Sequence, residues 1–314
     1  MRDPSSPSIA ILLPCYNEEH AIASVVQGFN KALPEATVYV YDNNSTDETC
    51  ARAAKAGAVV RTEPRQGKGN VIRRMFADID ADFYIMADGD GTYDAVDAPK
   101  LLAAAIDERL DMVVGSRKNI TVDAGRAGHA FGNKVFNFLF RQMFANGFSD
   151  IFSGYRVFSR RFVKSFPALS SGFEIETELS VHALVLKQPF TEIEVSYGTR
   201  MEGSVSKLST FCDGFRISSM FVLFMKETRP FVFFSYLTGI ALLASAFFGL
   251  PVLIEYFQTG FVTLIPRWIL SVGMLMVSMF MLVCGLILDS VARGRTEHKR
   301  MAYLAIPRWH TTRQ

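Results

Sequence analysis

Cysteine and histidine are scarce in this sequence, and neither is arranged to hold a metal or a disulfide framework. The 314 residues include four cysteines, Cys15, Cys50, Cys212 and Cys284, which are scattered without metal-ligand spacing. The five histidines form no H-x-x-x-H pair. Neither disulfides nor a zinc site is therefore expected.

An excess of charge of one sign is also missing. The formal net charge is +2 at pH 7, and no basic stripe with interleaved aromatic residues precedes the apolar C-terminal part. Nucleic-acid-binding proteins usually show such a stripe, so no nucleic-acid partner is expected. No secretory signal is recognisable, because MRDPSSPS leads into an apolar run of only Ile9 to Leu13. We therefore expect the domain that follows to stay in the cytoplasm.

Charged residues are absent from two long runs, Phe231 to Ile254 and Trp268 to Leu288. A helix needs about 20 apolar residues to cross a bilayer, so each run is long enough to do so. The alternative is a pair of buried core helices, but core helices seldom run so long without a charge. The sequence therefore predicts two transmembrane helices.

Basic residues flank this predicted hairpin on both sides, and Arg267 is the only one between the two runs. By the positive-inside rule both flanks are expected in the cytoplasm. We expect a soluble domain over residues 1–207, an amphipathic juxtamembrane segment over 208–230, a transmembrane hairpin over 231–290 and a basic tail over 291–314. The flanking residues are Lys226, Arg229, Arg293, Arg295, Lys299 and Arg300.

Short apolar segments alternate with helical patterns through the soluble domain. This alternation predicts a doubly wound α/β fold with a mostly parallel sheet, in which the turns after the strands meet at one edge. Strands are expected over residues 9–13, 37–41, 59–62, 83–86 and 112–115, with helices between them.

Two carboxylates follow the strand over residues 83–86, in the stretch FYIMADGDGTYD. Side chains two apart on an extended segment point the same way, so Asp88 and Asp90 should converge. Converging carboxylates repel unless a cation lies between them, and oxygen ligands favour Mg²⁺ or Mn²⁺. Such a site leaves positions for the phosphates of a nucleoside diphosphate. The alternative is an ordinary solvated turn.

Polar turns after the first two strands are candidates for binding a nucleotide. Pro14, Tyr16, Asn17 and Glu18 are suited to pack a base and ribose, and Asp42, with Asp47 near it, to accept from base or ribose groups. Helix capping explains the residues from Asp42 to Asp47 about as well.

Lys68 lies between two glycines, an arrangement that allows backbone and ammonium groups to approach a phosphate. It is not a Walker loop, because no glycine stands five residues before Gly67.

Arginines and acids follow further along the chain. Arg117 and Arg126 are candidates to grip a phosphate bidentately, the alternative being ordinary surface charge. The stretch FSDIFSGYRVF is expected to place Asp150, Ser153 and Arg156 in one tight turn. In GFEIETEL three acids alternate, so we expect them on one face. These acids are Glu174, Glu176 and Glu178.

The motifs LPCYNEE, DNNSTDET, GKGN, DGD, GSR, DIFSGYR, GFEIETEL and RMEGSVSKL, in this order, resemble those of the inverting family 2 glycosyltransferases. The resemblance spans about Ile9 to Leu208 and is closest to the polyprenyl-phosphate glycosyltransferases, such as dolichol-phosphate mannose synthases and bacterial undecaprenyl-phosphate glucosyltransferases. It implies a GT-A catalytic domain over residues 1–207. The implied activity is transfer of a hexosyl unit from a UDP- or GDP-sugar to polyprenyl phosphate, with Mg²⁺ or Mn²⁺, at the cytoplasmic side of the inner (plasma) membrane. The partners implied are the lipid bilayer and further copies of the chain, since similar bacterial members are tetramers.

The resemblance also assigns roles to residues. Asp88 and Asp90 match the metal and donor site, and Arg117 and Arg126 match clamps on the lipid phosphate. Further acceptor-side positions are Ser153, Arg200 and Lys207. The candidate nucleotide-sugar site consists of Pro14, Tyr16, Asn17, Glu18, Asp42, Lys68, Asp88, Gly89 and Asp90.

The chain departs from many relatives at three places. Gly89 stands where alanine is common, Asn43 stands where a second acid follows the first, and Gly91-Thr92-Tyr93 replaces a stretch that continues with Leu-Gln. The sugar and the base therefore stay open.

Two other functions compete with this one. A processive polysaccharide synthase needs a Q-x-x-R-W motif and more spans, whereas Arg267-Trp268 and Arg308-Trp309 follow Leu264 and Ala305. A non-catalytic membrane-anchored scaffold would not need both aspartates and the arginines.

Overall fold

The computed structural model describes residues 6–117, 148–172, 174–198 and 222–309. The chain divides into two compact units, which are considered separately. The first, the catalytic unit, consists of residues 1–215 together with 299–314, and the second, the hairpin unit, consists of residues 216–298. The second unit is therefore an insertion in the chain of the first.

A seven-stranded sheet in the order β3-β2-β1-β4-β6-β5-β7 forms the centre of the catalytic unit. All paired strands are parallel except β6, which runs antiparallel to both β4 and β5. The strands are β1 (Ile9–Cys15), β2 (Thr37–Asp42), β3 (Val59–Thr62), β4 (Phe83–Met86), β5 (Met112–Arg117), β6 (Arg156–Ser159) and β7 (Phe190–Val195). This is a GT-A-like mixed α/β sheet with a mostly parallel core, as expected.

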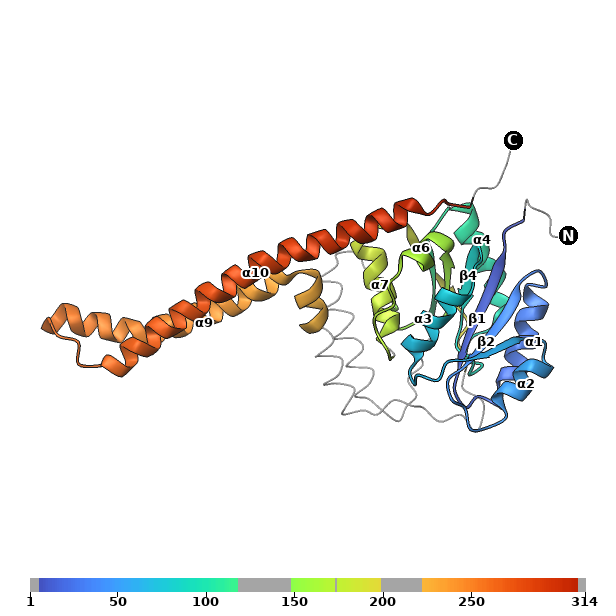
Figure 1. Ribbon diagram of the computed structural model, residues 1–314, viewed down its shortest axis with the longest axis horizontal. Coiled ribbons are helices and arrows are strands. Elements are labelled where there is room, and N and C mark those ends of the chain that lie inside the picture. The colour runs from blue at the N-terminus through green and yellow to red at the C-terminus, as the bar shows by residue number, and fades with distance from the viewer. Residues whose placement is uncertain (1–5, 118–147, 173, 199–221, 310–314) are drawn as a thin grey trace. The chain divides into compact units, whose positions relative to one another are not determined.

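Helices cover both faces of this sheet (Figure 1). Helix α1 shows why: Ile22, Val25, Val26 and Phe29 recur at helical spacing and are all buried against the strands. The helices of this unit are α1 (Ile22–Ala32), α2 (Thr49–Lys55), α3 (Lys68–Asp78), the 3₁₀ turn η1 (Ala95–Asp97), α4 (Ala98–Asp107), α6 (Arg160–Ser165) and α7 (Ile175–Val185).

All five predicted strands are confirmed, and three of them extend further than expected, among them β5, which continues to Arg117. β1 continues to Cys15 and β2 to Asp42, so both reach into the polar turns at the edge of the sheet. The antiparallel strand β6 was not predicted. Its four residues, RVFS, directly follow a loop rich in glycine and serine and carry no periodicity of their own.

The expected placement of three acids on one face is wrong. Glu174 is the N-cap of α7, and Glu176 and Glu178 lie in its first turn, so the segment is helical and its side chains do not alternate. The expected tight turn around Asp150, Ser153 and Arg156 also needs correction. Arg156 is the first residue of β6, where the chain is already extended.

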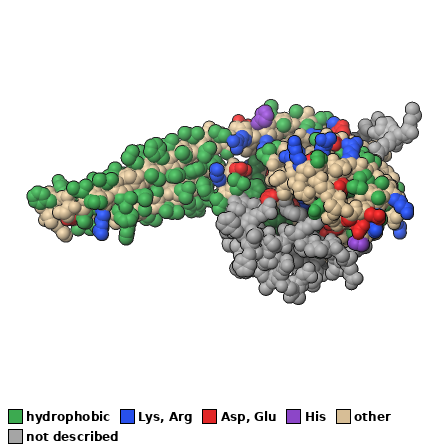
Figure 2. Space-filling view, turned by 60° about the horizontal axis from the view of Figure 1, so that its bottom comes forward, with side chains coloured by type: hydrophobic (Ala, Val, Ile, Leu, Met, Phe, Trp, Pro, Cys, Tyr) green, Lys and Arg blue, Asp and Glu red, His purple; other side chains and the backbone are tan. Residues whose placement is uncertain are grey.

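Two long apolar helices, α9 (Pro230–Thr259) and α10 (Ile265–Ala305), make up the hairpin. Both are long and apolar enough to cross a membrane, and only 22% and 17% of their most apolar windows are buried. Figure 2 shows hydrophobic side chains over much of the hairpin's surface. Core helices would be mostly buried, so the predicted transmembrane helices are favoured over the alternative of core helices. Most of the expected juxtamembrane segment lies outside the described residues.

Candidate active site

Two turns are tied together at the carboxyl edge of the sheet, after β1 and after β2. Asn17 donates its backbone N–H to Ser45 Oγ at 2.8 Å, and its side-chain oxygen accepts from the N–H of Thr46 at 2.8 Å. The backbone N–H of Glu18 donates to Thr49 Oγ1 at 2.8 Å. Asn17 therefore fixes the shape of this edge. Pro14, at the end of β1, and Tyr16 are half-buried beside it.

Asp42 lies at the end of β2 and is buried. Its Oδ2 accepts from the N–H of Ser45 at 3.0 Å, whereas Oδ1 is buried with no hydrogen-bond partner among the described residues. Burial raises the pKa of the neighbouring Cys50 thiol, and the Asp42 carboxylate raises it further. Asp42 does not cap helix α2: its N-cap is Glu48, and Asp47, one residue earlier, accepts from the N–H of Thr49 at 3.0 Å. Since buried polar atoms are normally satisfied, Oδ1 fits a donor on a ligand.

The two aspartates follow β4 in a turn that two glycines keep compact. A Cβ on Gly154 would lie 2.6 Å from Asp88 Oδ2, and a Cβ on Gly89 would lie 2.4 Å from Cys15 Sγ. Asp90 is buried, and its Oδ1 accepts from the N–H of Thr92 at 3.1 Å and from its hydroxyl at 2.7 Å. The missing side chains thus make room for the Asp88 carboxylate and for the turn that carries it.

Lys68 is buried between two carboxylates. Its Nζ lies 2.5 Å from Asp88 Oδ1 and 2.5 Å from Glu176 Oε1. Burial lowers the pKa of Lys68, but the two carboxylates raise it by more, so its pKa lies above the usual range. Burial raises the pKa of Glu176, and Lys68 opposes this rise. The contact between Lys68 and Glu176 joins α3 to α7, and sequence reasoning did not find it.

The glycines around Lys68 do not lie against open space. A Cβ on Gly67 would lie 2.2 Å from the carbonyl oxygen of Ser171, and one on Gly69 would lie 2.2 Å from that of Ser170. The N–H of Gly69 donates to Ser171 at 3.0 Å. These glycines therefore allow close packing of two loops, which brings Lys68 to Asp88.

Arg117, at the end of β5, forms a bidentate pair with Asp150. Its Nε and Nη2 lie 2.8 Å and 2.7 Å from the two carboxylate oxygens. Burial lowers the pKa of Arg117, but Asp150 raises it by more, so the guanidinium stays charged. Its carbon lies 5.4 Å from the ring centre of Tyr197. One edge of the guanidinium is thus already used, and an added phosphate would have to meet the Nη1 side.

Ser153 is not at the surface, and its expected role on the acceptor side stays a prediction. It is fully buried, and its hydroxyl donates to the carbonyl of Gly115 at 2.5 Å. Arg156 is also fully buried, and its guanidinium donates to the carbonyls of Ser153 and Ile151 at 2.9 Å and 2.5 Å. Arg156 thus fixes the loop that carries Asp150. A charged residue between apolar strand residues was the signal for this role.

The remaining expected site residues, Arg126, Arg200 and Lys207, lie outside the described residues. No group of three or more His, Cys, Asp and Glu side chains suited to hold a metal occurs in residues 6–117, 148–172, 174–198 and 222–309. Asp88 and Asp90 are therefore the candidate protein ligands of a cation, with other oxygens needed to complete its shell.

Similar proteins identify the family of this chain. It is 35% identical to the glycosyltransferase AglJ of Haloferax volcanii over 233 residues, which cover 74% of this chain and 76% of AglJ. It is 25% identical to the dolichyl-phosphate hexose transferase of the same organism over 221 residues, covering 70% of this chain and 95% of that protein.

Among solved structures, glucosyl-3-phosphoglycerate synthase from Mycobacterium tuberculosis, in complex with Mn²⁺ and UDP-glucose, has the same fold. The TM-score is 0.56 at 19% identity, covering 71% of this chain and 79% of that one. Residues 10–166 of this chain match the family described as glycosyl transferase family 2. This chain therefore belongs to glycosyl transferase family 2.

Proposed function

We propose that this protein transfers a hexosyl unit from a UDP- or GDP-sugar to polyprenyl phosphate in the inner (plasma) membrane. The observation that carries the proposal is the aspartate pair after β4, beside a buried lysine, in a family 2 chain with two long apolar helices. An enzyme with a soluble acceptor would not need two apolar helices of this length, whereas a lipid acceptor lies in the bilayer. The dolichyl-phosphate hexose transferase, similar over 70% of this chain, is named for this kind of acceptor.

The donor would occupy the edge formed by β1, β2 and β4. The buried Oδ1 of Asp42 is suited to accept an N–H of the base, with Tyr16 and Pro14 beside it. Asp88, Gly89 and Asp90 lie at the end of the adjacent strand β4, where the diphosphate would follow. Glucosyl-3-phosphoglycerate synthase, which shares the fold, was crystallised with Mn²⁺ and UDP-glucose.

A divalent cation fits the chemistry of this donor set. Asp88 and Asp90 supply carboxylate oxygens, the ligands preferred by Mg²⁺ and Mn²⁺. When bound, such a cation would stabilise negative charge on the leaving diphosphate. The chain's own contribution is to hold both carboxylates in a turn with little freedom, through Thr92 on Asp90 and Lys68 on Asp88.

The reaction needs no carboxylate base. A phosphomonoester has a second pKa of about 6, so the acceptor is largely ionised at neutral pH. The nearby acids are held by other groups: Asp150 binds Arg117, Glu176 binds Lys68, and Glu178 accepts the N–H groups of Leu169 and Ser170 at 3.0 Å and 2.8 Å. A single in-line displacement would invert the anomeric carbon, so an α-linked donor would give a β-linked product.

The acceptor phosphate would be held mainly by arginines and lysine. Arg117 offers the guanidinium edge that Asp150 does not use, and Arg126, Arg200 and Lys207 are proposed to complete the grip. We also propose that the protein forms a homo-oligomer, with a tetramer as the first candidate.

Both ends of the hairpin join the catalytic unit, since residues 299–314 belong to it together with residues 1–215. Two crossings return the chain to the side on which it started, so both flanks lie on one side of the membrane. The basic flanks favour the cytoplasmic side. A reporter fused after Gln314 should therefore give a cytoplasmic signal.

The experiment is to incubate membranes containing the protein with a panel of radiolabelled nucleotide sugars and to extract the lipids. Label in a monosaccharide-bearing lipid phosphate is expected, and Asp90→Asn should lower it by orders of magnitude. Asp94→Asn is the matched control, because Asp94 lies in the same loop and only caps η1, accepting from Val96 at 3.0 Å. Full turnover in excess chelator would refute the proposed requirement for a divalent cation.

Other outcomes separate the competing functions. Label in a polymer that stays out of the lipid extract would indicate a processive synthase. No transfer and no hydrolysis from any donor, by folded protein that binds nucleotide, would indicate a scaffold.

A further inference from the structure

The C-terminal segment, residues 300–309, is docked on the catalytic unit through a buried carboxylate. The Tyr303 hydroxyl donates to Asp111 Oδ2 at 2.6 Å, and the exposed fractions are only 4% for Tyr303 and 1% for Asp111. Ser159 donates to the other oxygen of Asp111 at 2.7 Å, and Arg308 Nη2 lies 3.6 Å from Oδ2. Asp111 thus has partners both from the sheet and from the C-terminal segment.

Other contacts hold the same segment. The ring of Tyr303 has the guanidinium carbons of Arg161 and Arg300 at 4.1 Å and 5.1 Å from its centre. Arg300 also donates to the carbonyl of Leu186 at 2.7 Å. The Trp309 ring meets Phe83 edge to face at 5.9 Å. The docking therefore combines a buried hydrogen bond, cation–π contacts and an aromatic contact.

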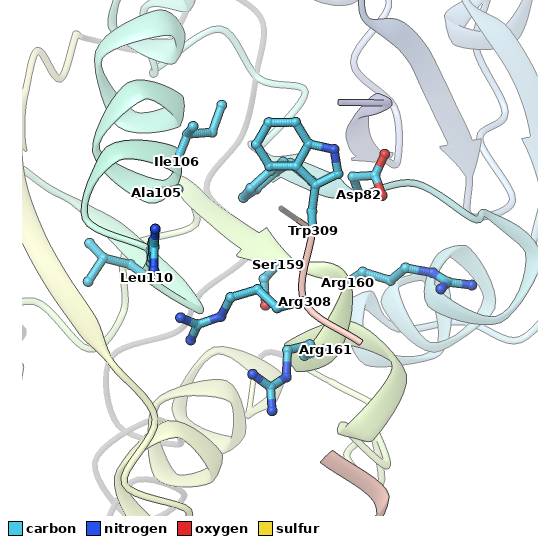
Figure 3. A pocket seen from close by; sticks show the side chains of 11 residues that line it. Asp82, Ala105, Ile106, Leu110, Ser159, Arg160, Arg161, Arg308 and Trp309 are labelled. Carbon is cyan, nitrogen blue, oxygen red and sulfur yellow. The ribbon is translucent and has the colours of Figure 1, made fainter. Parts of the chain in front are cut away.

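Trp309 lines a pocket together with residues from β4, α4, β6 and α6 (Figure 3). Its volume is about 50 Å³, which is small, and three of its arginines are already engaged: Arg160 with Asp80 at 2.9 Å, Arg161 with Tyr303 and Arg308 near Asp111. Figure 3 shows the Arg160 side chain pointing away from those of Arg161 and Arg308. The chain's own segment therefore forms one wall of this small pocket, and the three engaged arginines leave little free charge for an anion.

The docking point lies at the ends of the strands opposite to the candidate active site. Phe83 is the first residue of β4, and Asp111 directly precedes β5. The other ends of these two strands lead to Asp88 and Arg117. The segment therefore contacts β4 and β5 at the ends that lie away from Asp88 and Arg117.

We propose that residues 300–309 form a strap that completes the catalytic unit at the point where the chain returns to it after residue 298. Docking depends on the hydrogen bond from Tyr303 to Asp111. Release of the strap should weaken transfer to a membrane acceptor more than binding of a soluble donor, since only the acceptor must enter from the bilayer. This second consequence rests on the proposed function.

The first test is hydrogen exchange of the full-length protein in detergent or nanodiscs. Tyr303→Phe and Asp111→Asn should each speed exchange over residues 300–309 by about tenfold, because the first removes and the second weakens the buried hydrogen bond that holds the strap. The double variant should exchange little faster than either single one. Tyr39→Phe is the matched control, because Tyr39 lies in β2, away from the strap. Wild-type exchange rates over residues 300–309 in both single variants would refute the proposed strap.

The second test compares donor dissociation constants and lipid-acceptor turnover in the same proteins. Tyr303→Phe should lower turnover several-fold while leaving the affinity for UDP or GDP unchanged. Faster exchange with wild-type turnover would overturn the coupling to the membrane acceptor. If wild-type protein transfers nothing to lipid, the proposed function fails, and the exchange result still decides whether the strap exists.

Discussion

Gly89 lies between the two candidate metal ligands, and the structure explains why this chain has glycine where many relatives have alanine. A Cβ at this position would lie 2.4 Å from Cys15 Sγ and 3.6 Å from Ile22 Cδ1. Cys15 is buried, and its thiol donates to the carbonyl of Leu13 at 3.5 Å, so the sulfur has little room to move. A side chain at position 89 would thus collide with the sulfur of Cys15.

Gly89→Ala should therefore strain the turn that carries Asp88 and Asp90. Overpacking a buried site costs about 1–3 kcal/mol. For a folded unit of this size, each kcal/mol lowers Tm by about 2–4 °C. Activity should fall more steeply, because a shift of about 1 Å in a reacting group can cost about a hundredfold in rate. Thermal melts and initial transfer rates measure the two effects.

Cys15→Ala provides the decisive comparison, because it removes the sulfur that the new Cβ would meet. The double variant Cys15→Ala/Gly89→Ala should be more stable and more active than Gly89→Ala alone. Gly198→Ala is the control, since a Cβ there meets nothing closer than Thr92 O at 3.8 Å. If Gly89→Ala matches the wild type, or if the two substitutions are additive, the steric explanation is refuted.

Three further predictions follow from buried charges. Glu176→Gln should lower transfer by about tenfold or more, because Lys68 loses a buried partner; a changed limb in the pH–rate profile would instead indicate a base. Arg117→Lys should raise KM for the lipid acceptor more than for the donor, since lysine cannot both replace the bidentate pair with Asp150 and offer a second N–H edge to the acceptor phosphate; equal changes in steady-state KM would contradict this. Burial, and then Lys299, lowers the pKa of His182 from 6.5 to about 3. The unfolded chain therefore binds a proton that the folded chain excludes, and stability falls by about 1.4 kcal/mol per pH unit from about pH 6.5 toward pH 3. His182→Phe should flatten this slope in denaturant titrations between pH 7 and pH 5, and an unchanged slope would count against the assignment.

Local patterns in the sequence were sufficient to predict the first five strands and the two aspartates after β4. Short apolar runs and polar turn residues act over a few positions, so they are visible without knowledge of the fold. The same rule failed for Glu174, Glu176 and Glu178. Their alternation resembled a strand, but Ile175, Leu179 and Ala183 recur at helical spacing and are buried on α7.

Contacts between distant positions could not be predicted. Lys68 and Glu176 are 108 positions apart, and Tyr303 and Asp111 are 192 positions apart. Neither pair has a spacing that a local pattern can reveal. Residues 291–314 were identified by their positive charge alone, and charge gives no indication that Tyr303 is buried.

The pairing of charges at the site gives a physical reason for a cation between Asp88 and Asp90. Two buried basic side chains of the site are each paired with a carboxylate: Lys68 with Glu176, and Arg117 with Asp150. Arg156, also buried, donates to backbone carbonyls of the loop that carries Asp150. The two pairs are each neutral, Arg156 adds one positive charge against the two carboxylates of Asp88 and Asp90, and Lys68 is shared with Asp88 rather than given to it alone. Bringing a negatively charged diphosphate to two carboxylates is unfavourable unless positive charge arrives with it. A donor that binds together with a divalent cation meets this requirement, so nucleotide affinity should depend on the cation more strongly than on any single side chain of the site.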